Sequence, residues 1–355
     1  MARTTADPDV LVVGCGAAGA ATAHRLARDG HEVLVLDRHG VPNAVGSSHG
    51  RRRIFRLAYH EGATYLPLLR RSLAAWRALD SRRAAPGALF RRTGSLTVGP
   101  PESDLVAGAR ETCASGGVDH EVLPGDGVDD RFPAWTLGEG YRALYQPDGG
   151  LLDPERCLSA LVREARAAGA RVRANVRVDA VRAAGGGVRV VSSAGTYEAG
   201  AAVVAAGPWT GALVPELSDL LTVKRHVYAR VGATDPDRVA PDACPVFVVE
   251  TRDGQHVYGL PAHRTPGVKV GRTDTDEAGV DPSRLARPAP GEERDAVRFV
   301  DEFLGGATGA LGVGACPVTD SPDGGYVVDR APGAERIVVA CGLSGHGFKT
   351  APAVG

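Results

Sequence analysis

The sequence lacks any long apolar run, and this absence argues against a membrane protein. No stretch approaches the roughly 20 consecutive apolar residues that a helix needs to span a bilayer. Residues 1–8 also lack the apolar core of a secretory signal peptide. Both absences predict a cytoplasmic protein.

An excess of charge of either sign is also missing. Lysine and arginine together number 41, aspartate and glutamate 42, and the formal net charge is -1. A protein that neutralises many phosphates is expected to be distinctly basic. The charge balance therefore argues against nucleic acid as a partner.

Closely spaced cysteines are absent as well. The six cysteines lie far apart, and none forms a Cys-x-x-Cys pair: Cys15, Cys113, Cys157, Cys244, Cys316 and Cys341. Such spacing in a chain of this length argues against a disulfide framework and a zinc knuckle, so we expect no metal. Most of these thiols are expected to be buried and reduced, because a free cysteine packs as a small apolar residue.

Lysine is scarce. Only Lys224, Lys269 and Lys349 occur among the 41 basic residues. Arginine serves wherever a diffuse positive charge suffices, whereas lysine offers a compact ammonium whose pKa shifts readily on burial. The three lysines are either chance survivors or residues kept for that property.

The N-terminal sequence has the pattern of a βαβ unit. Residues 9–13 form a short apolar strand, a glycine-rich turn leads into a helix that runs to about residue 28, and residues 31–37 form the next strand. Further helices are expected at 65–79, 153–168 and 292–303, and strands near 172, 178, 188–191, 201–206 and 337–340. Residues 84–147 are mixed, with many glycine and proline turns, and antiparallel strands are expected there.

The glycine-rich turn predicts a dinucleotide site. Gly14, Gly16 and Gly19 form a Gly-x-Gly-x-x-Gly motif between strand and helix, and Asp37 ends the next strand 23 residues after Gly14. The glycines let the backbone approach a pyrophosphate at the helix N-terminus, and the Asp37 carboxylate can accept hydrogen bonds from a ribose. These residues alone do not distinguish NAD from FAD as the bound dinucleotide. The run 203–207, a buried strand that ends in Gly207, resembles the second signature of flavoproteins and favours FAD.

Length and element order predict two domains. We expect an α/β fold with a Rossmann-like FAD-binding domain of the glutathione reductase type and a strand-rich α+β substrate domain. The expected FAD-binding domain is discontinuous and comprises residues 1–80, 150–219 and 316–355. The expected substrate domain comprises residues 81–149 and 220–315.

Three further motifs make the sequence similar to the monomeric sarcosine oxidase family, which includes N-methyltryptophan oxidase. The first is Gly-Ser-Ser-His-Gly at 46–50, followed by Arg53, Ile54, Arg56, Ala58-Tyr59 and Glu61-Gly62. The second runs from Cys316 to Asp329 and includes Thr319 and Pro322-Asp323-Gly324. The third is Gly-Leu-Ser-Gly-His-Gly-Phe-Lys at 342–349. With the N-terminal motif, the resemblance spans nearly the whole chain.

The resemblance implies a role for several residues. Cys316 would carry the flavin through a thioether to its 8α-methyl group. Arg56 and Lys349 would hold the substrate carboxylate, which suits a fork-shaped donor beside a point charge. Lys269 would lie near flavin N5 and promote the reaction with oxygen, and Tyr258 would line the substrate pocket.

Further residues match the cofactor contacts of the family. Arg53 would lie beside the flavin ring. The full set expected to contact the cofactor is Gly14, Gly16, Gly19, Asp37, Ser47, Ser48, His49, Arg53, Val178, Gly207, Cys316, Gly345, Gly347 and Lys349. Family members continue for a few dozen residues after the position of Gly355, so either the chain is cut short or a last helix that packs on the FAD-binding domain is absent.

Other residues near these motifs have plainer interpretations. Arg51 and Arg52 are expected on a solvated basic face, because most charge runs are surface features. Lys224 is expected at the surface, and His263 and Arg264 in an exposed loop. Thr273 stands where the family has a histidine four residues after its lysine, which argues against sarcosine itself as the substrate.

The sequence thus predicts an FAD-dependent oxidase for a small secondary amine or amino acid. We expect a monomer whose partners are O2 and the small amine or amino-acid substrate. Arg56 and Lys349 would hold the carboxylate while a C–H bond is oxidised to give an imine, and oxygen would be reduced to hydrogen peroxide. Two alternatives remain: a dehydrogenase that uses another electron acceptor, and a flavin-binding protein without catalysis. An NADPH-dependent aromatic hydroxylase is disfavoured, because Gly345-His346 occupies the region of that family's Gly-Asp motif.

Overall fold

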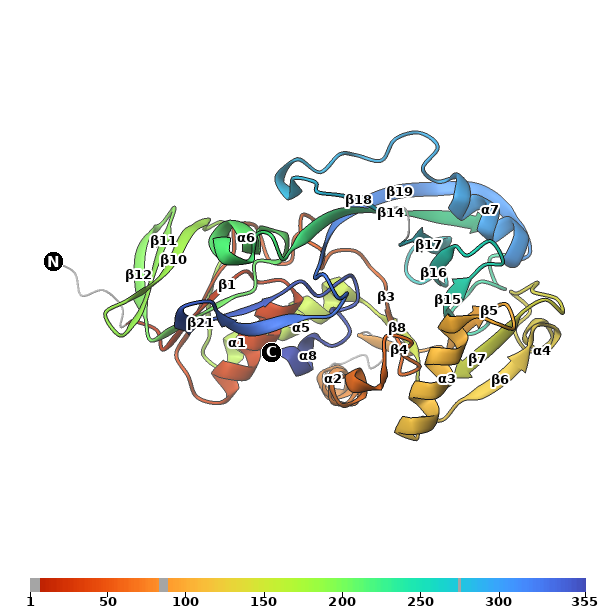
Figure 1. The fold of residues 1–355 in the computed structure, drawn as a ribbon, viewed down its shortest axis with the longest axis horizontal. Coiled ribbons are helices and arrows are strands. Elements are labelled where there is room, and N and C mark those ends of the chain that lie inside the picture. The colour runs from red at the N-terminus through yellow and green to blue at the C-terminus, as the bar shows by residue number, and fades with distance from the viewer. Residues whose placement is uncertain (1–6, 83–88, 274–275) are drawn as a thin grey trace.

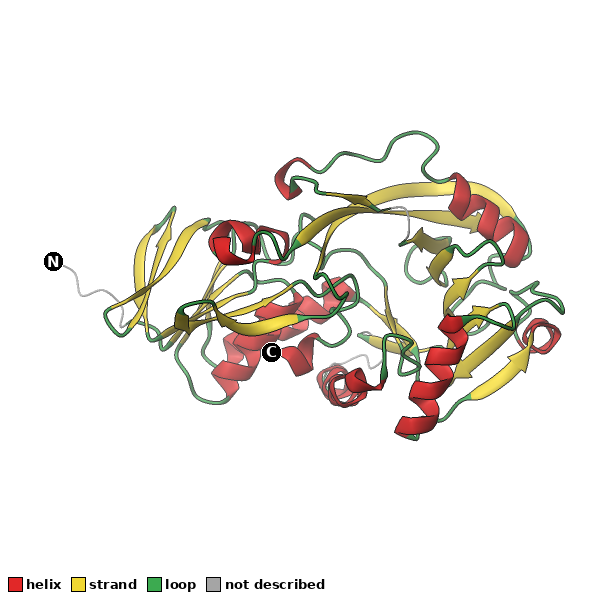
Figure 2. Cartoon of the chain, in the orientation of Figure 1, coloured by secondary structure: helices red, strands yellow, loops and turns green. Residues whose placement is uncertain are grey.

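A computed structural model describes residues 7–82, 89–273 and 276–355, and its strands form two large sheets (Figures 1 and 2). The six-stranded sheet has the order β20-β21-β13-β1-β2-β9. Its strands are β1 (Val10–Val13), β2 (Val33–Leu36), β9 (Arg171–Arg173), β13 (Ala201–Val204), β20 (Val327–Ala331) and β21 (Ala334–Cys341). All neighbours are parallel except β20, which is antiparallel to β21.

The central strands of this sheet are buried on both faces. Val12 and Val35 pack against helices α1 (Ala17–Arg28) and α5 (Pro154–Ala167). Leu11 and Leu34 pack on the other side with the three-stranded sheet of β10 (Val178–Ala184), β11 (Gly187–Ser192) and β12 (Gly195–Ala199) and with the region of α6 (Thr210–Leu213). Burial on both faces explains why β1 and β2 are continuous apolar runs.

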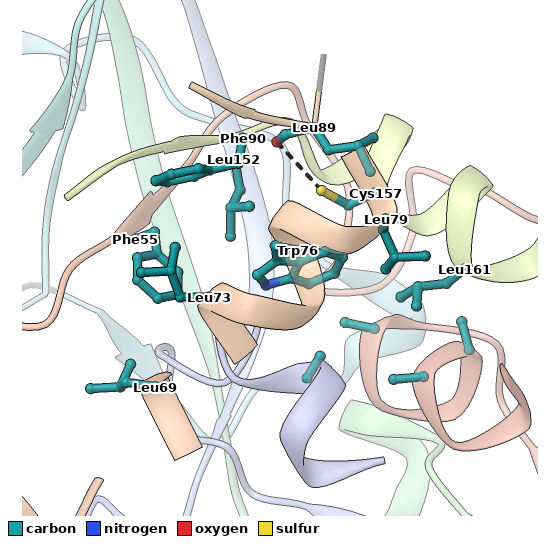
Figure 3. Close-up of a cluster of buried hydrophobic side chains, with 14 of the residues drawn as sticks. Phe55, Leu69, Leu73, Trp76, Leu79, Leu89, Phe90, Leu152, Cys157 and Leu161 are labelled. Atoms are coloured by element: carbon teal, nitrogen blue, oxygen red, sulfur yellow. Dashed lines mark hydrogen bonds between the residues drawn. The ribbon is translucent and has the colours of Figure 1, made fainter. Parts of the chain in front are cut away.

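A tryptophan joins the N-terminal and C-terminal parts of the core beside this sheet (Figure 3). Trp76, on α2 (Leu66–Ser81), is fully buried, and its Nε1 donates a hydrogen bond to the Lys349 carbonyl oxygen at 2.9 Å. Its ring stacks on Phe348 with 6.0 Å between centroids. The run 342–349 and the short α8 (Ala351–Val354) are therefore held against α2 by specific contacts.

The second large sheet has nine strands in the order β18-β14-β17-β16-β15-β5-β7-β6, with β19 paired to β14. Its strands are β5 (Ser95–Gly99), β6 (Glu121–Pro124), β7 (Arg142–Gln146), β14 (Thr222–Ala233), β15 (Val246–Glu250), β16 (His256–Leu260), β17 (Val268–Arg272), β18 (Glu277–Ala278) and β19 (Ala307–Asp320). The long β14–β19 pair extends from the second sheet towards the first (Figure 1). It thereby carries side chains of the second sheet to the first.

Smaller elements complete the second half of the molecule. Helices α3 (Asp104–Gly116), α4 (Gly125–Arg131) and α7 (Arg294–Phe303) accompany the nine-stranded sheet (Figure 1). A small antiparallel sheet of β3 (Arg53–Phe55), β8 (Gly150–Leu152) and β4 (Phe90–Arg92) lies between the two large sheets in this view. Within the described ranges, four short 3₁₀ helices cover Ala63–Tyr65, Gly207–Trp209, Pro215–Leu217 and Pro282–Arg284.

Most of the elements expected from the sequence are present. The predicted βαβ unit corresponds to β1, α1 and β2, and the predicted helices correspond to α2, α5 and α7. α5 begins at Pro154, and the Asp153 carboxylate accepts a hydrogen bond from the Arg156 backbone N–H at 3.1 Å. Helix α3 was not predicted, because its glycines are poor helix formers. Ser103 caps the start of this helix, and Gly117, with a φ of 59°, ends it.

All six cysteines are buried, which agrees with the expectation that most of them pack inside the protein. Across the part of the chain that the structure describes, no helix is long and apolar enough to cross a membrane. Residues 1–6, on which part of the localisation prediction depends, lie outside the described residues.

Candidate active site

One cavity of about 820 Å³ gathers nearly all of the predicted site residues. This volume lies within the range of cofactor and ligand sites. Its wall includes Gly14, Gly16, Asp37, Ser47, Ser48, Arg53, Arg56, Val178, Gly207, Tyr258, Lys269, Cys316, Gly345, Gly347 and Lys349. Gly19 and His49 lie next to the cavity wall residues but do not line it themselves.

The glycine motif brings the backbone of β1, α1 and β13 into close contact. Gly14 has a φ of 93°, and a Cβ added to it would lie 2.4 Å from the Ala205 carbonyl oxygen. A Cβ added to Gly19 would lie 2.0 Å from the Gly14 carbonyl oxygen. Gly19 therefore permits close packing of helix on strand, whereas Gly14 and Gly16 form the cavity wall.

Asp37 and Ser48 shape the same end of the cavity. The Asp37 carboxylate accepts hydrogen bonds from the backbone N–H of Cys15 at 2.6 Å and of His39 at 2.8 Å. These bonds fix the carboxylate at the cavity wall, where its remaining lone pairs can accept further donors. The Ser48 hydroxyl oxygen accepts a hydrogen bond from the Ala17 N–H at 3.0 Å, so a polar loop meets the N-terminus of α1.

Substitution of Gly14 by alanine should remove the cofactor from the purified protein. The added methyl group has no room beside Ala205, and any shift of the turn displaces the α1 N-terminus. Gly30→Ala is the matched control, because Gly30 has the same φ of 93° but no atom within 4 Å of its added Cβ. We expect Gly30→Ala to keep its flavin and to lower the free energy of unfolding by only about 1–2 kcal/mol through backbone strain. The flavin-to-protein absorbance ratio measures the difference, and full flavin content in Gly14→Ala would refute the assignment.

Arg52 is buried, so its predicted place on a solvated basic face is wrong. Its guanidinium donates hydrogen bonds to the carbonyl oxygens of Pro261 at 2.7 Å and Gly267 at 2.8 Å, and to the Thr265 hydroxyl at 2.7 Å. These acceptors belong to the loop between β16 and β17, whose inward carbonyl groups need donors. Arg51 is exposed, as expected.

Arg53 organises the loop that precedes β3. Its Nη2 donates to the carbonyl oxygens of Ser47 and His49, both at 2.8 Å. The Ser47 hydroxyl in turn donates to the Pro317 carbonyl oxygen at 2.6 Å, next to Cys316. His49 Nδ1 lies 2.6 Å from the Gly46 carbonyl oxygen. These hydrogen bonds connect the loop at 46–50 and Arg53 to Pro317, the residue after Cys316, and form one continuous part of the cavity wall.

Lys269 presents an isolated, buried side-chain amine to the cavity. Its side chain is 8% exposed, and its Nζ lies 4.0 Å from the centroid of the Tyr228 ring. Among the described residues it has no hydrogen bond or ion pair. Burial, and then the charge of Arg53, holds the pKa of Lys269 well below its usual value. Cys316 is also buried, and burial raises the pKa of its thiol although Arg53 and Lys269 act in the opposite direction.

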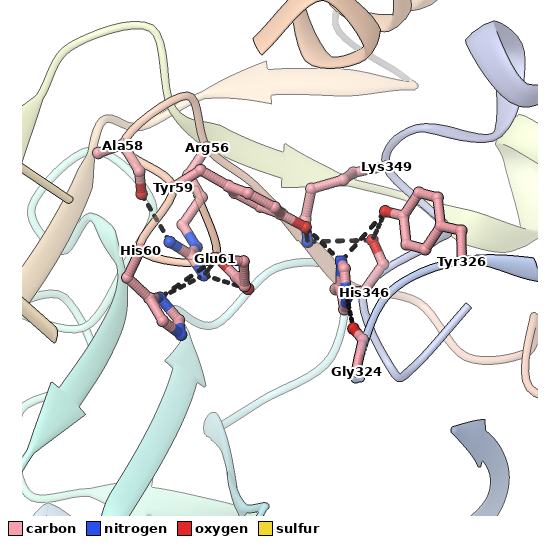
Figure 4. Close-up of polar contacts among 9 residues, drawn as sticks. All are labelled: Arg56, Ala58, Tyr59, His60, Glu61, Gly324, Tyr326, His346 and Lys349. Atoms are coloured by element: carbon pink, nitrogen blue, oxygen red, sulfur yellow. Dashed lines mark hydrogen bonds and ion pairs between the residues drawn. The ribbon is translucent and has the colours of Figure 1, made fainter. Parts of the chain in front are cut away.

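Arg56 and Lys349 lie on either side of Tyr59 (Figure 4). The Arg56 Cζ is 4.7 Å from the Tyr59 ring centroid, and the Lys349 Nζ donates to the Tyr59 hydroxyl at 3.3 Å and to the His346 carbonyl oxygen at 3.2 Å. Arg56 is already engaged, because its Nη2 contacts both carboxylate oxygens of Glu61 at 2.9 Å. Glu61, which belongs to the motif at 46–62, was not predicted to have a role in the site.

Burial sets the charges of this cluster. Burial and then Arg56 lower the pKa of Lys349 to about 7, and they lower the pKa of His60 to about 3. Burial raises the pKa of Glu61, but Arg56, His60 and Lys349 outweigh this effect and bring it down to about 2. Near neutral pH, Lys349 is therefore the group in this cluster whose charge is most easily changed.

Two residues of the cavity wall, His226 and Asp276, were not predicted from the sequence. His226 on β14 and Asp276 before β18 are in contact, with 2.8 Å between Nδ1 and Oδ1, and His226 Nε2 lies 2.7 Å from the Tyr258 hydroxyl. The only local signal was the alternation of polar residues at 224, 226 and 228 on one face of a strand. Asp276 could not be linked to His226 without the strand pairing.

The remaining expectations have mixed outcomes. Lys224 is not simply a surface residue, since it lines the cavity beside His226 and pairs with Asp320 at 2.7 Å. This correction follows from its position on the inward face of β14. Arg264 is exposed, as expected, while His263 is half-buried, and neither lines the cavity.

A family model, two curated relatives and a solved structure all match this chain over nearly its whole length. Residues 9–355 match the family of FAD dependent oxidoreductases (DAO). The chain is 34% identical to monomeric sarcosine oxidase from Bacillus sp. (strain B-0618), with 98% of this chain and 90% of the relative covered. It is 33% identical to N-methyl-L-tryptophan oxidase from Salmonella dublin, with 98% and 92% covered. Its structure matches NikD, an unusual amino acid oxidase essential for nikkomycin biosynthesis, with a TM-score of 0.84, 28% identity, and 99% and 92% of the two chains covered.

Proposed function

Because this chain belongs to the FAD dependent oxidoreductase family, we propose that it oxidises a secondary amine or an amino acid to an imine while O2 is reduced to H2O2. The observation that carries the proposal is a single cavity lined by Gly14 and Gly16 of the glycine motif, by the Arg56–Lys349 pair and by the isolated amine of Lys269. The similarity to two amine oxidases supports the same reaction class.

The cavity residues fit FAD. The close approach of Gly14 to Ala205 and the positive φ of Gly207 leave bare backbone where a dinucleotide would pass, and Asp37 offers carboxylate oxygens to a ribose. Lys269 is a buried cation without an anionic partner among the described residues, which suits a site that stabilises negative charge. When bound, FAD would supply the acceptor for the two electrons of the substrate C–H bond.

The protein would position the substrate through its carboxylate. The Arg56 fork and the Lys349 ammonium face one another across Tyr59 and together can grip a carboxylate. Arg56 forms an ion pair with Glu61, so a substrate carboxylate that binds Arg56 would have to share or displace this ion pair. Tyr258 lines the same cavity and would form part of the pocket around the amine. A small amino acid is therefore the proposed substrate class.

This proposal is tested by adding a panel of amines to the flavin-loaded protein without oxygen. We expect the flavin absorbance to bleach with at least one N-methyl or cyclic amino acid, and hydrogen peroxide to appear when air is admitted. Matched amines that lack the carboxylate should bleach the flavin far more slowly. No bleaching across the panel would support a flavin-binding protein without catalysis and would overturn the proposal.

We further propose that Cys316 attaches the flavin covalently. The Cys316 thiol lines the cavity and lies beside the connected wall of Ser47 and Arg53. Acid denaturation of the wild-type protein should leave the yellow colour with the polypeptide, whereas Cys316→Ser should release it. Cys341→Ser, a buried cavity cysteine in β21, is the matched control and should keep its colour on the polypeptide. Complete release of flavin from the wild type would remove Cys316 from this role.

Carboxylate binding should depend on pH through Lys349. Its pKa of about 7 means that the free protein loses this charge as the pH rises, while a bound carboxylate favours the protonated form. The Kd of an amine-free carboxylate such as 2-furoate should be constant below about pH 7 and rise by up to roughly tenfold per pH unit above it. Lys349→Arg keeps its charge and should show a flat profile. A flat profile in the wild type would contradict this interpretation.

A further inference from the structure

A chain of three hydrogen-bonded side chains, Asp276, His226 and Tyr258, lies in the cavity wall. Asp276 Oδ1 is 2.8 Å from His226 Nδ1, and His226 Nε2 is 2.7 Å from the Tyr258 hydroxyl oxygen. The His226 and Tyr258 rings are stacked with 5.5 Å between centroids. The side chains of His226 and Asp276 are each 8% exposed. The chain is therefore shielded from bulk water but reaches the cavity.

The partners fix the direction of these hydrogen bonds. An ionised carboxylate only accepts hydrogen bonds, so His226 Nδ1 is protonated and donates a hydrogen bond to Asp276. In the neutral imidazole, Nε2 is then unprotonated and accepts a hydrogen bond from the Tyr258 hydroxyl. The Tyr258 oxygen keeps its lone pairs for a donor in the cavity. This order matches a carboxylate–histidine–hydroxyl arrangement in which the hydroxyl can pass on a proton.

Strand pairing holds the chain in place. Tyr258 on β16 lies opposite Gly271 on β17, and a Cβ at Gly271 would approach the Tyr258 hydroxyl oxygen to 2.7 Å. The absence of a side chain there leaves room for the tyrosine ring. On the other side of His226, β19 places Cys316 directly opposite in the ladder. The relay therefore lies next to the residue proposed to carry the flavin.

The charged and titratable groups around the chain come from every neighbouring strand. Lys224 is two residues before His226 on the same face of β14, and its ammonium is paired with Asp320. Lys269 of β17 has its Nζ 5.6 Å from the Tyr258 ring centroid, and Tyr228 lies beside it. Beyond these, Cys316 of β19, His256 of β16 and Arg53 of β3 line the same cavity. Asp276 is thus the carboxylate in direct contact with the imidazole.

An amine substrate brings a proton that must leave before its C–H bond is oxidised. An aliphatic amine is protonated near neutral pH, as lysine is, and its cation is a poor donor of hydride equivalents. Resting on the proposed function, we propose that Tyr258, His226 and Asp276 form the relay that accepts this proton. Tyr258 would touch the amine, whereas His226 and Asp276 would act through it.

The proton transfer balances without any further reactant. The N–H bond of the substrate ammonium breaks as its proton moves to the Tyr258 oxygen, and the Tyr258 proton moves to His226 Nε2. The products are a neutral amine, an unchanged tyrosine and an imidazolium paired with the Asp276 carboxylate. One positive charge moves from the substrate to His226, and no electrons are transferred.

The test compares the pH dependence of anaerobic flavin bleaching in His226→Gln and Asp276→Asn, with the fastest amine of the panel as the probe. We expect His226→Gln to be about 100-fold slower near pH 7 and to approach the wild-type rate as the pH nears the amine's own pKa. Asp276→Asn should lose about tenfold with the same recovery at high pH. His263→Gln, which removes a half-buried histidine outside the cavity wall, should keep the wild-type profile.

A second readout does not depend on turnover. The hydrogen-bonded Nδ1 proton of His226 should give a downfield proton resonance in the holoprotein that is absent in His226→Gln and Asp276→Asn, remains in His263→Gln and shifts in Tyr258→Phe. If His226→Gln does not fold, Asp276→Asn carries both measurements. A folded variant that is slower by the same factor at every pH, or that retains the wild-type profile, would overturn the relay. Failure of the wild type to bleach with any amine would instead overturn the proposed function.

Discussion

Lys269→Met should slow the reaction of the reduced flavin with oxygen about 100- to 1000-fold and leave anaerobic reduction by the amine nearly unchanged. The reason is electrostatic: reduction of oxygen creates negative charge, and Lys269 offers a buried ammonium to the cavity without an anionic partner among the described residues. Among the described residues, its Nζ makes cation–π contacts with the faces of Tyr228 and Tyr258. Burial holds the pKa of Lys269 well below its usual value, and the negative charge that forms during the reaction would favour its protonated form.

The measurement is a two-stage stopped-flow experiment in which the flavin is first reduced without oxygen and then mixed with oxygen. Lys269→Arg keeps a positive charge and should recover much of the rate. Because Met replaces a desolvated cation with an apolar side chain of similar length, Lys269→Met should also raise the free energy of unfolding. If the wild type reacts slowly with oxygen but rapidly with artificial electron acceptors, and Lys269→Met changes neither, the protein is a dehydrogenase.

Arg56→Met should lower kcat/KM for carboxylate-bearing substrates about 100- to 1000-fold. Arg56 is 4% exposed and supplies one half of the proposed carboxylate grip. The same substitution leaves the half-buried Glu61 carboxylate without its arginine, which should cost about 1–3 kcal/mol of stability. Activity and stability therefore fall together in the single variant and cannot be separated by it.

The double variant Arg56→Met/Glu61→Gln separates these effects. Its neutral glutamine removes the uncompensated charge, so thermal unfolding should return towards that of the wild type while kcat/KM stays low. An amine that lacks a carboxylate should be oxidised at similar rates by the wild type and by the double variant. Recovery of kcat/KM for the amino acid in the double variant would show that Arg56 acts on the fold and not on the substrate.

The parts of the molecule that were predictable have local signals. The Gly14 turn lies between a strand and a helix in the sequence itself, and Asp37 follows at the expected distance. The scarcity of lysine and the family motifs together indicated a chemical role for Lys269 and Lys349, and both residues line the cavity. Helix α5 was recognisable because Asp153 and Pro154 form a strong start signal.

The parts that were missed depend on contacts between distant segments. Arg52 resembles its exposed neighbour Arg51 in sequence, and only the loop between β16 and β17 supplies the carbonyl groups that bury it. His226 and Asp276 are 50 residues apart, and they meet because β18 pairs with β14. No local pattern encodes that pairing.

We propose that one cavity holds the flavin ring between the Arg56–Lys349 pair, which binds the substrate carboxylate, and the Lys269 amine. The most direct test is a crystal structure of the flavin-loaded protein with bound 2-furoate. We predict that the furoate carboxylate lies within hydrogen-bonding distance of both Arg56 and Lys349, and that the flavin ring separates it from Lys269. A furoate bound away from Arg56 and Lys349, or a ring that does not approach Lys269, would contradict the account.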